Sequence, residues 1–280
     1  MKRLLHIMFL ILFFIGLTFT GLTLAQIGGG VKKKRPLPHE YGRVIIDNYK
    51  ELWYPVHLKE PSAPVVFDHW LHRARFTCRL CHIDIAFAME ASATGIRASD
   101  NKKGYYCGTC HNGKMVYNDR EVFASCSKNF QEEDVKRCVR CHSLGKNVKR
   151  EYDFYTFTEK LPRGRFGNGI DWEKAEAEGL IKPIDFLEGV SIRSFQLEAP
   201  KDFDLEAKVE GIPNIIFSHK KHTVWNGCEV CHPEIFIGVK KGITKFTCVN
   251  NFEGKYCGAC HRTVAFPMLD CQRCHIKAVQ

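Results

Sequence analysis

The first 25 residues carry the longest apolar run of the chain. It spans residues 4–24, follows the basic residues Lys2 and Arg3, and ends in small residues that favour cleavage after Ala25. This order is typical of a secretory signal peptide. The run is nearly long enough to cross a membrane, but basic residues 32–35 follow directly, and a retained anchor would place them outside, against the positive-inside tendency. We therefore predict a signal peptide over residues 1–25, with an uncleaved anchor as the alternative.

After this run the chain has no second apolar span. The arm over residues 26–64 is basic and then interrupted by prolines, which predicts an extended segment. Within residues 149–212, Asp171 and Gly179 enclose a short helical pattern, because aspartate can cap a helix and glycine can end it. We therefore expect residues 149–212 to be a linker with one short helix. Four aromatic residues of this linker are expected to pack in the interior rather than to bind a partner: Phe154, Tyr155, Phe157 and Phe166.

Cysteine is unusually frequent, with 14 cysteines against 11 prolines and 5 methionines. Such a number indicates disulfides, a metal site or a covalent cofactor. All but two of the cysteines occur in six copies of one pattern, in which two residues separate a cysteine pair and a histidine follows directly. The copies are Cys78, Cys81 and His82; Cys107, Cys110 and His111; Cys138, Cys141 and His142; Cys228, Cys231 and His232; Cys257, Cys260 and His261; and Cys271, Cys274 and His275.

The repeated pattern is the attachment motif of c-type haem. Two thiols three positions apart share one helical turn, where each can add to a haem vinyl group, and the following histidine can bind the iron. A zinc site does not require histidine after every cysteine pair, redox dithiols occur singly, and a disulfide framework would not repeat one local spacing six times. The sequence therefore predicts six covalently bound c-type haems, with the six motif histidines as proximal iron ligands.

The basic composition has a different meaning once these cofactors are counted. The formal net charge is +10 with a pI of about 8.9, and loss of Lys2 and Arg3 would leave +8. Six haems would add two propionates each, about −12 if all ionise, which leaves about −4. We therefore do not expect a nucleic-acid partner.

The six motifs fall into two copies of a three-motif unit. In both copies a Phe-x-His-x-x-His opening, at 67–72 and 217–222, ends 6 positions before a motif, and the first two motifs start 29 positions apart. The third motif starts 31 positions after the second in the first copy but 14 in the second copy, so the first copy holds a 17-residue insertion. The insertion lies around residues 117–133 and is polar, which predicts a surface loop or a short helix.

These segments resemble the c7-type triheme cytochrome domain, a relative of the tetrahaem cytochromes c3. The resemblance covers about 65–145 and 213–277, roughly half of the chain, and rests on the opening followed by three haem motifs. It implies a multihaem cytochrome c fold of mostly short α-helices and ordered loops with little β structure, in which haems replace much of the hydrophobic core. A small sheet is expected near each opening. We therefore expect triheme modules at 65–148 and 213–280.

The resemblance also implies distal ligands for four irons, because the first opening histidine of that family faces the first haem and the second faces the next. The pairs, distal then proximal, are His69 with His82, His72 with His111, His219 with His232, and His222 with His261. Neither copy has the further histidine that c7 cytochromes use for their third haem, so the irons on His142 and His275 lack an evident distal ligand. Of 13 histidines, only His39 and His57 are left for these irons once His6 leaves with the signal peptide. We hypothesise that these two ligate them, within one chain or across subunits.

Other residues compete for these two distal positions. Cys248 stands 9 positions before the fifth motif, and Met89, Met115 and Met268 lie near haem motifs. A methionine ligand would raise the reduction potential of its haem, whereas two histidines keep it low. Cys126 and Cys248 are alternatively one disulfide or two free thiols.

Closely spaced haems predict electron transfer rather than catalysis, with each iron cycling between ferric and ferrous states. We expect an exported protein, in the periplasm or at the cell surface, that carries electrons in an anaerobic-type respiratory chain. The expected partners are other cytochromes or a membrane quinol-oxidising complex, with peripheral membrane association or a homo-oligomer as variants. The alternatives are a multihaem oxidoreductase for nitrite, hydroxylamine or sulfur oxyanions, which needs an open haem, and a subunit of a conductive filament. Because every motif ends in histidine, the electron carrier is favoured over the enzyme.

Overall fold

The computed structural model describes residues 36–46, 64–126, 135–144, 146, 152–192, 197–207, 209–238 and 240–277. All but the first of these residues belong to one structural unit, residues 37–280. The predicted signal peptide and His57 lie outside the described residues. Within those ranges, no helix is both long enough and apolar enough to cross a membrane.

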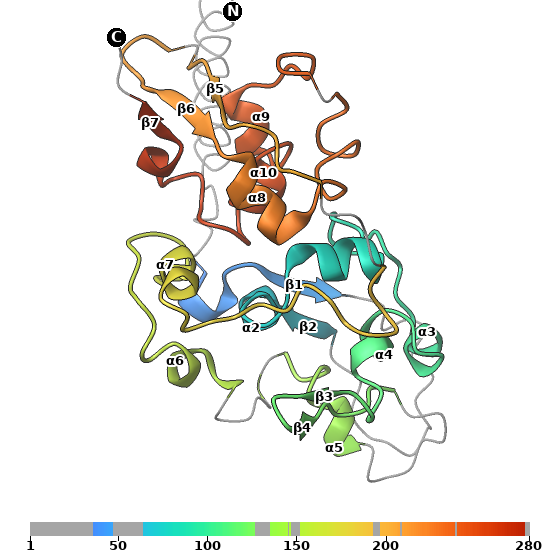
Figure 1. The fold of residues 1–280 in the computed structure, drawn as a ribbon. Coiled ribbons are helices and arrows are strands. Elements are labelled where there is room, and N and C mark those ends of the chain that lie inside the picture. The colour runs from blue at the N-terminus through green and yellow to red at the C-terminus, as the bar shows by residue number, and fades with distance from the viewer. Residues whose placement is uncertain are drawn as a thin grey trace, which may run out of the picture. The chain divides into compact units, whose positions relative to one another are not determined.

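The described elements are short: every strand has two to four residues and the longest helix has eight. The first part of the chain contains η1 (Pro38–Glu40), β1 (Arg43–Ile46), β2 (Val65–Asp68), α2 (His69–Arg73), η3 (Leu80–Asp84), α3 (Ala98–Lys102), α4 (Cys107–Cys110), β3 (Val116–Tyr117), β4 (Arg120–Glu121) and α5 (Val135–Cys138). These are followed by α6 (Phe154–Phe157), α7 (Trp172–Ala177), β5 (Phe203–Leu205), β6 (Asn214–Phe217), α8 (His219–Asn226), α9 (Cys248–Phe252), α10 (Gly258–His261), η6 (Cys271–Arg273) and β7 (His275–Lys277). Figure 1 shows them joined by long loops, which confirms the predicted fold class.

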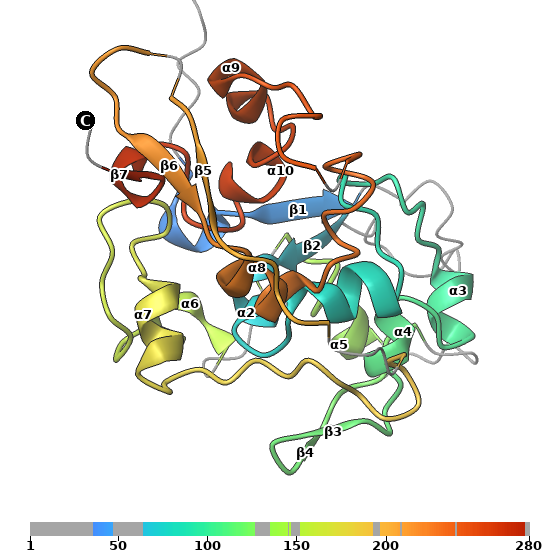
Figure 2. The same ribbon diagram turned by 45° about the horizontal axis from the view of Figure 1, so that its top comes forward.

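A small antiparallel sheet precedes each Phe-x-His-x-x-His opening, as the resemblance implies. β1 pairs with β2 with Val44 opposite Phe67, and β5 pairs with β6 with Phe203 opposite Phe217. β7 adds to the second sheet, and the β-branched and aromatic residues of these segments favour strands. α2 starts directly after β2, and α8 starts one residue after β6 (Figure 2). The two histidines of each opening therefore lie three positions apart on one helical face.

The main hydrophobic cluster is built by the predicted linker together with α2. The Trp70 and Phe154 rings meet edge to face with their centres 5.1 Å apart, an arrangement that aromatic pairs prefer. The linker therefore fixes the helix that carries the first two opening histidines. The buried members of the cluster are Trp70, Ala74, Phe154, Leu161, Ile170, Trp172, Ala175 and Ile181.

The predicted linker helix is confirmed as α7. The Asp171 carboxylate accepts the backbone N–H of Lys174 at 3.1 Å, which caps the helix. Gly179 follows with a φ of +70°, a left-handed conformation that glycine adopts without strain and that ends the helix.

The expectation that the linker aromatic residues pack inside holds for some of them. Phe154 is buried and Phe157 packs against the hydrophobic cluster, while Phe166 is half-buried. Tyr155 is 55 % exposed among the protein atoms, and for Tyr155 the expectation stays a prediction. Tyr155 directly follows Phe154 on the single turn of α6, and adjacent helical positions point to different sides.

The insertion of the first copy is predicted to be a loop or a short helix, but its described part begins with a β-hairpin. β3 and β4 pair with Tyr117 opposite Arg120. The two turn residues, Asn118 and Asp119, have φ of +48° and +58°. Positive φ at both positions defines the two-residue hairpin turn that asparagine and aspartate tolerate, and this turn chemistry explains the difference.

Candidate haem centres

Four attachment motifs close a helical turn through their own histidine. The histidine N–H donates to the carbonyl of the first motif cysteine at 2.8 Å in His111 and His142, 3.0 Å in His232 and 2.9 Å in His261. This bond spans four residues, as in an α-helix. It brings both thiols and the imidazole onto one turn, the arrangement that attachment and ligation of one haem require.

Glycine is needed at the second position of the two equivalent central motifs. A Cβ on Gly108 would lie 2.0 Å from the carbonyl oxygen of Asn101, and one on Gly258 would lie 1.8 Å from that of Asn251. The close approach of α3 to α4, and of α9 to α10, therefore depends on the missing side chain. The same backbone contact thus positions both motifs.

Nine of the predicted ligand histidines are held at Nδ1 by a backbone carbonyl. The proximal ones contact the oxygens of other residues as follows: His82 with Phe87 at 2.8 Å, His111 with Phe123 at 3.3 Å, His232 with Phe236 at 2.8 Å, His261 with Phe266 at 3.1 Å and His275 with Pro213 at 2.6 Å. The distal candidates do the same: His69 with Gly42 at 2.7 Å, His72 with Asp68 at 3.2 Å, His219 with Lys201 at 3.3 Å and His222 with Ser218 at 2.8 Å. Because a carbonyl oxygen only accepts, each Nδ1 donates, which leaves the Nε2 lone pair for a metal.

These orienting carbonyls are a functional feature that the sequence analysis missed. Three of them belong to phenylalanines that follow a proximal histidine by four or five positions: Phe87, Phe236 and Phe266. The Phe266 ring also lies 4.3 Å from the ring of His261. A phenylalanine at this distance after a motif was therefore a signal present in the sequence.

Two of the expected distal–proximal pairs meet in the structure. The ring centres of His72 and His111 are 6.4 Å apart, and those of His222 and His261 are 6.0 Å apart. An imidazole nitrogen binds a first-row metal at about 2 Å and lies about 1 Å from its ring centre, so two rings on one iron have centres about 6 Å apart. The spacing of both pairs therefore fits one iron between the rings.

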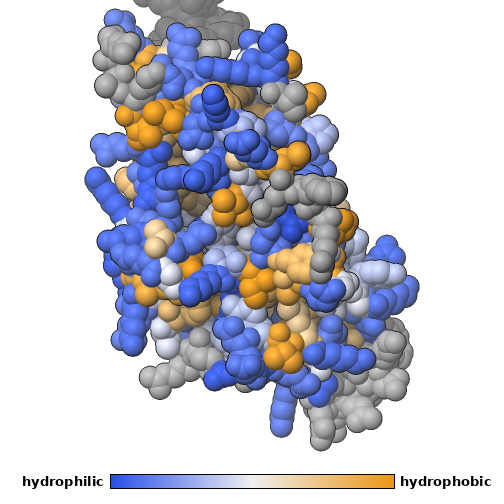
Figure 3. Space-filling view, viewed as in Figure 1, coloured by the Kyte–Doolittle hydropathy of each residue, from blue (hydrophilic) through white to orange (hydrophobic). Residues whose placement is uncertain are grey.

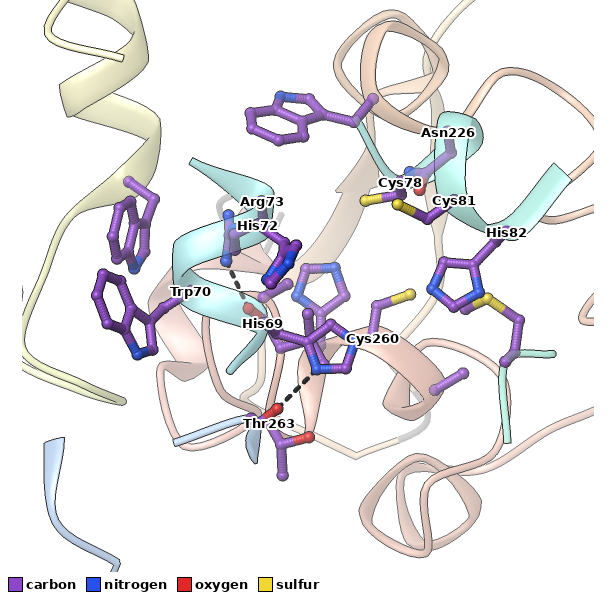
Figure 4. A pocket seen from close by; sticks show the side chains of 18 of the residues that line it. His69, Trp70, His72, Arg73, Cys78, Cys81, His82, Asn226, Cys260 and Thr263 are labelled. Atoms are coloured by element: carbon purple, nitrogen blue, oxygen red, sulfur yellow. Dashed lines mark hydrogen bonds between the residues drawn. The ribbon is translucent and has the colours of Figure 1, made fainter. Parts of the chain in front are cut away.

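The other two expected pairs differ from each other. His69 and His82 lie close enough to influence each other electrostatically, and Figure 4 shows them on opposite sides of a space into which the sulfur of Cys260 projects. His219 contacts the Phe217 ring, with centres 5.0 Å apart. In the described residues it has no ring contact with its expected partner, His232, which lies against Phe236 instead.

Burial keeps the paired imidazoles neutral. It lowers the pKa of His72 to about 3, with a further contribution from nearby His111, and the pKa of His261 to about 4. Burial also lowers the pKa of His111 and His222. The neutral imidazole is the form that binds a metal, so these side chains are ready to ligate at neutral pH.

The space around the motifs is far larger than one ligand needs. A connected cavity of about 3400 Å³ is lined by motif cysteines, the histidine pairs and aromatic rings, whereas a pocket for one small molecule measures about 300–1,000 Å³. Across the described ranges, no group of three or more His, Cys, Asp or Glu side chains is arranged to hold a metal ion. Haem supplies the remaining iron ligands itself and needs only axial residues from the protein. Paired histidines in a large cavity therefore fit several haems.

The remaining candidate ligands occupy separate places. His39 lies in η1, with its Nδ1 3.5 Å from the hydroxyl of Tyr155, and its proposed ligand role stays a prediction. Cys126 and Cys248 are both free thiols, so the alternative of a disulfide between them is wrong. The Asn101 side chain donates to Cys126 at 3.9 Å. Met89, Met115, Met268 and Cys248 line the large cavity.

Covalent attachment motifs beside pairs of neutral, oriented histidines define a multihaem c-type cytochrome. The family described as cytochrome c7 and related cytochrome c matches residues 65–143 and 215–276, which together make half of the chain. The chain belongs to this family, as predicted, and the family transfers electrons. Its cofactors are accordingly c-type haems.

Several solved structures are similar to this chain. A c7-type three-haem cytochrome domain is 36% identical over 28% of this chain and 95% of that domain, with a TM-score of 0.26. The C-terminal hexahaem fragment of GSU1996 is 24% identical over 83% of this chain and 96% of the fragment, with a TM-score of 0.25. The dodecahaem cytochrome c GSU1996 is 26% identical over 77% of this chain and 71% of that protein, with a TM-score of 0.25. No curated protein matches the chain.

Proposed function

We propose that this chain binds six c-type haems, one at each attachment motif, and carries electrons between redox proteins without catalysing a reaction on a substrate. The observation that carries this proposal is the spacing of the His72–His111 and His222–His261 rings, at 6.4 and 6.0 Å. A pair of axial histidines closes both coordination positions of an iron, which favours electron transfer over substrate binding.

The same reasoning extends to the other irons. His69 with His82 and His219 with His232 would ligate the first haem of each module. The Nδ1 contacts of these histidines with carbonyl oxygens support the assignment, because each contact leaves Nε2 available. His39 and His57 would complete the irons on His142 and His275, as the histidine count suggests.

When bound, each haem iron supplies a one-electron ferric–ferrous couple. The protein orients the ligands through backbone carbonyls and keeps the imidazoles neutral by burial. Modules at 65–148 and 213–280, joined by the 149–212 linker, would together form an electron path within one chain. The signal-like segment at 1–25 supports export, and a periplasmic or cell-surface carrier would serve a respiratory chain, with other cytochromes or a membrane quinol-oxidising complex as partners.

Counting the haems tests this proposal. The mature protein is expressed with the cytochrome c maturation apparatus, and its intact mass and pyridine haemochrome absorbance are measured. Six haems per chain and a fully reversible six-electron titration are expected. A matched variant, Cys271→Ala with Cys274→Ala, should bind one haem fewer. A wild-type chain that carries fewer than six haems, or that takes up fewer than six electrons, would contradict the proposal.

A further inference from the structure

A half-buried arginine joins the two triheme copies. Arg73 is the last residue of α2 and directly follows His72, and its Nη1 donates to the carbonyl of Val264 in the second copy at 2.5 Å. The guanidinium carbon lies 5.5 Å from the ring centre of Trp172 and 5.6 Å from that of Trp225. Arg73 therefore contacts the linker helix α7, helix α8 and the segment after α10 at one point.

The charge of Arg73 has little compensation from the protein. Partial burial lowers the pKa of Arg73, and the nearby groups that oppose this effect are Cys78, Glu176 and Cys260, of which the two cysteines are uncharged once they are bound to haem as thioethers. Glu176 is the only carboxylate among these three described residues, and it is itself hydrogen-bonded to Trp225. Burying a guanidinium costs free energy unless an anion or dipole stabilises it. The position of this charge therefore calls for an explanation beyond packing.

Attachment motifs from both copies converge beside Arg73. The sulfur of Cys78, in the first motif, lies near those of Cys231 and Cys260, in the fourth and fifth motifs. Figure 4 shows Cys78, Cys81 and Cys260 around one space next to Arg73. Since thioether bonds would tether each haem to these sulfurs, the attachment sites of haems from both copies meet at this junction.

A second contact fixes the same junction. Arg79, inside the first motif, forms ion pairs with Asp84 at 3.0 Å and Asp185 at 3.3 Å. A Cβ on Gly227, directly before the fourth motif, would lie 2.7 Å from the Cδ of Arg79. Gly227 has a φ of +62°, so both its conformation and the approach of Arg79 require glycine. The first and fourth motifs are thus held together by backbone and side chain.

We propose that electrons pass between the two triheme copies at this junction, between the haems of the first and fifth motifs, and that Arg73 raises the reduction potential of this pair. The inference rests on the proposed function. In the step, the ferrous iron of one haem loses one electron and the ferric iron of the other gains it; no bond changes and no proton moves. A nearby positive charge stabilises the ferrous state, which carries one positive charge fewer.

Removing the charge of Arg73 while keeping the length of its side chain tests this inference. Arg73→Met removes the charge, Arg73→Lys keeps it, and Arg163→Met is the control, because Arg163 is an exposed linker residue and its loss changes the net charge equally. Each six-haem protein is titrated electrochemically while NMR follows the assigned haem methyl signals. In Arg73→Met, the ferric–ferrous equilibrium of the first and fifth haems should shift at least tenfold toward ferric, about 59 mV for a one-electron couple. Arg73→Lys should retain most of the wild-type potential, and Arg163→Met should leave all six potentials unchanged.

Each outcome has a separate meaning. Unchanged potentials in an Arg73→Met protein that still carries six haems would overturn the role of Arg73, as would an equal shift of all six potentials. A wild-type protein with fewer than six haems would instead contradict the proposed function. If Arg73→Met fails to fold, Arg73→Gln replaces it and is titrated beside Arg73→Lys. Lower potentials of the first and fifth haems in Arg73→Gln but not in Arg73→Lys would support the inference. Equal potentials in the two variants would overturn it.

Discussion

Helices α2 and α8 occupy equivalent places in the two copies but are supported differently. α2 buries Trp70, and its C-cap residue Ala74 is also buried, in the hydrophobic cluster of the linker. The equivalent positions of α8 are Lys220, which is exposed, and Val224, which is 58 % exposed. Both helices nevertheless place two histidines three positions apart with Nδ1 on a backbone carbonyl. The orientation of the opening histidines is therefore repeated between the copies, while the protein core is not.

The difference extends over the whole of the second copy. Val230 is the only buried hydrophobic residue that the described part of this copy contributes. Figure 3 shows apolar side chains scattered on the surface of the molecule. The second copy contains many of the exposed large hydrophobic residues: Ile216, Val224, Ile237, Ile243, Val249, Phe252, Leu269 and Ile276. We therefore expect the second copy to depend on its haems for stability more than the first does.

Loss of one haem should reveal the largest difference in stability between the two copies. Cys257→Ala with Cys260→Ala removes the attachment of the fifth haem, and Cys107→Ala with Cys110→Ala removes the equivalent attachment in the first copy. Limited proteolysis with mass spectrometry should show cleavage throughout the second copy in the former variant, but only near α4 in the latter, because the linker core still holds α2. Equal cleavage of both copies would contradict the comparison.

The two helices should also respond differently to truncation. Trp70→Ala is expected to destabilise the protein by about 3–5 kcal/mol, since it removes a buried aromatic ring from the cluster. Lys220→Ala, the equivalent change in α8, should alter stability by less than about 0.5 kcal/mol. Chemical denaturation of the holoproteins measures both, and a large effect of Lys220→Ala would show that α8 packs in a way the structure does not have.

The central motifs should behave alike, because their backbone contact is the same in both copies. Gly108→Ala and Gly258→Ala each place a Cβ within 2.0 Å of a carbonyl oxygen. We expect each to cost about 1–3 kcal/mol from overpacking, and to reduce haem incorporation at that motif, measured by intact mass. The control is Ala259→Thr, which gives the fifth motif the sequence of the second and should be neutral. Full occupancy in both glycine variants would refute the close-contact explanation.

The smallest effect is expected where the linker meets the second copy. Burial opposes ionisation of Asp171, but the N–H of Lys174 and the guanidinium of Arg273 together lower the pKa of its carboxyl below the ordinary 3.8. Its ion pair with Arg273 at 2.6 Å should contribute about 0.5 kcal/mol. A carboxyl whose pKa is lowered on folding stabilises the protein above its unfolded pKa and loses that effect as pH falls through the folded one.

Asp171→Asn measures this contribution, because asparagine still caps a helix. The variant should be less stable than wild type at pH 7, and the difference should vanish as the pH falls below about 4. Denaturation midpoints at a series of pH values provide the comparison. A difference that stays constant down to pH 2 would mean that the cap, rather than the charge, accounts for it.

The attachment chemistry could be predicted from the sequence because it is local. In each motif the two cysteines and the histidine are close in sequence, and in each opening the two histidines lie three positions apart. Spacing alone therefore places the members of each group on one helical turn. The linker helix was also predictable, since Asp171 and Gly179 mark its ends. The β3–β4 hairpin was missed because the Asn118–Asp119 turn was not recognised within a polar insertion.

The supports of the site could not be predicted, because they join distant parts of the chain. Gly42 orients His69 and Pro213 orients His275 through backbone carbonyls that any residue could supply. The contact of Arg73 with Val264 spans 191 positions. The aromatic residues of the linker indicated an interior place without indicating that they would form the main core with Trp70.

Low-temperature EPR of the oxidised, haem-quantified protein tests the paired-histidine arrangement most directly. If each iron is held by two axial ligands, all six should be low-spin and ferric, and His72→Ala should convert one iron to high spin. His222→Ala should do the same in the second copy. A stoichiometric high-spin signal in the wild-type protein would show an open haem, contradict the electron-carrier proposal, and favour an oxidoreductase that binds a small anion.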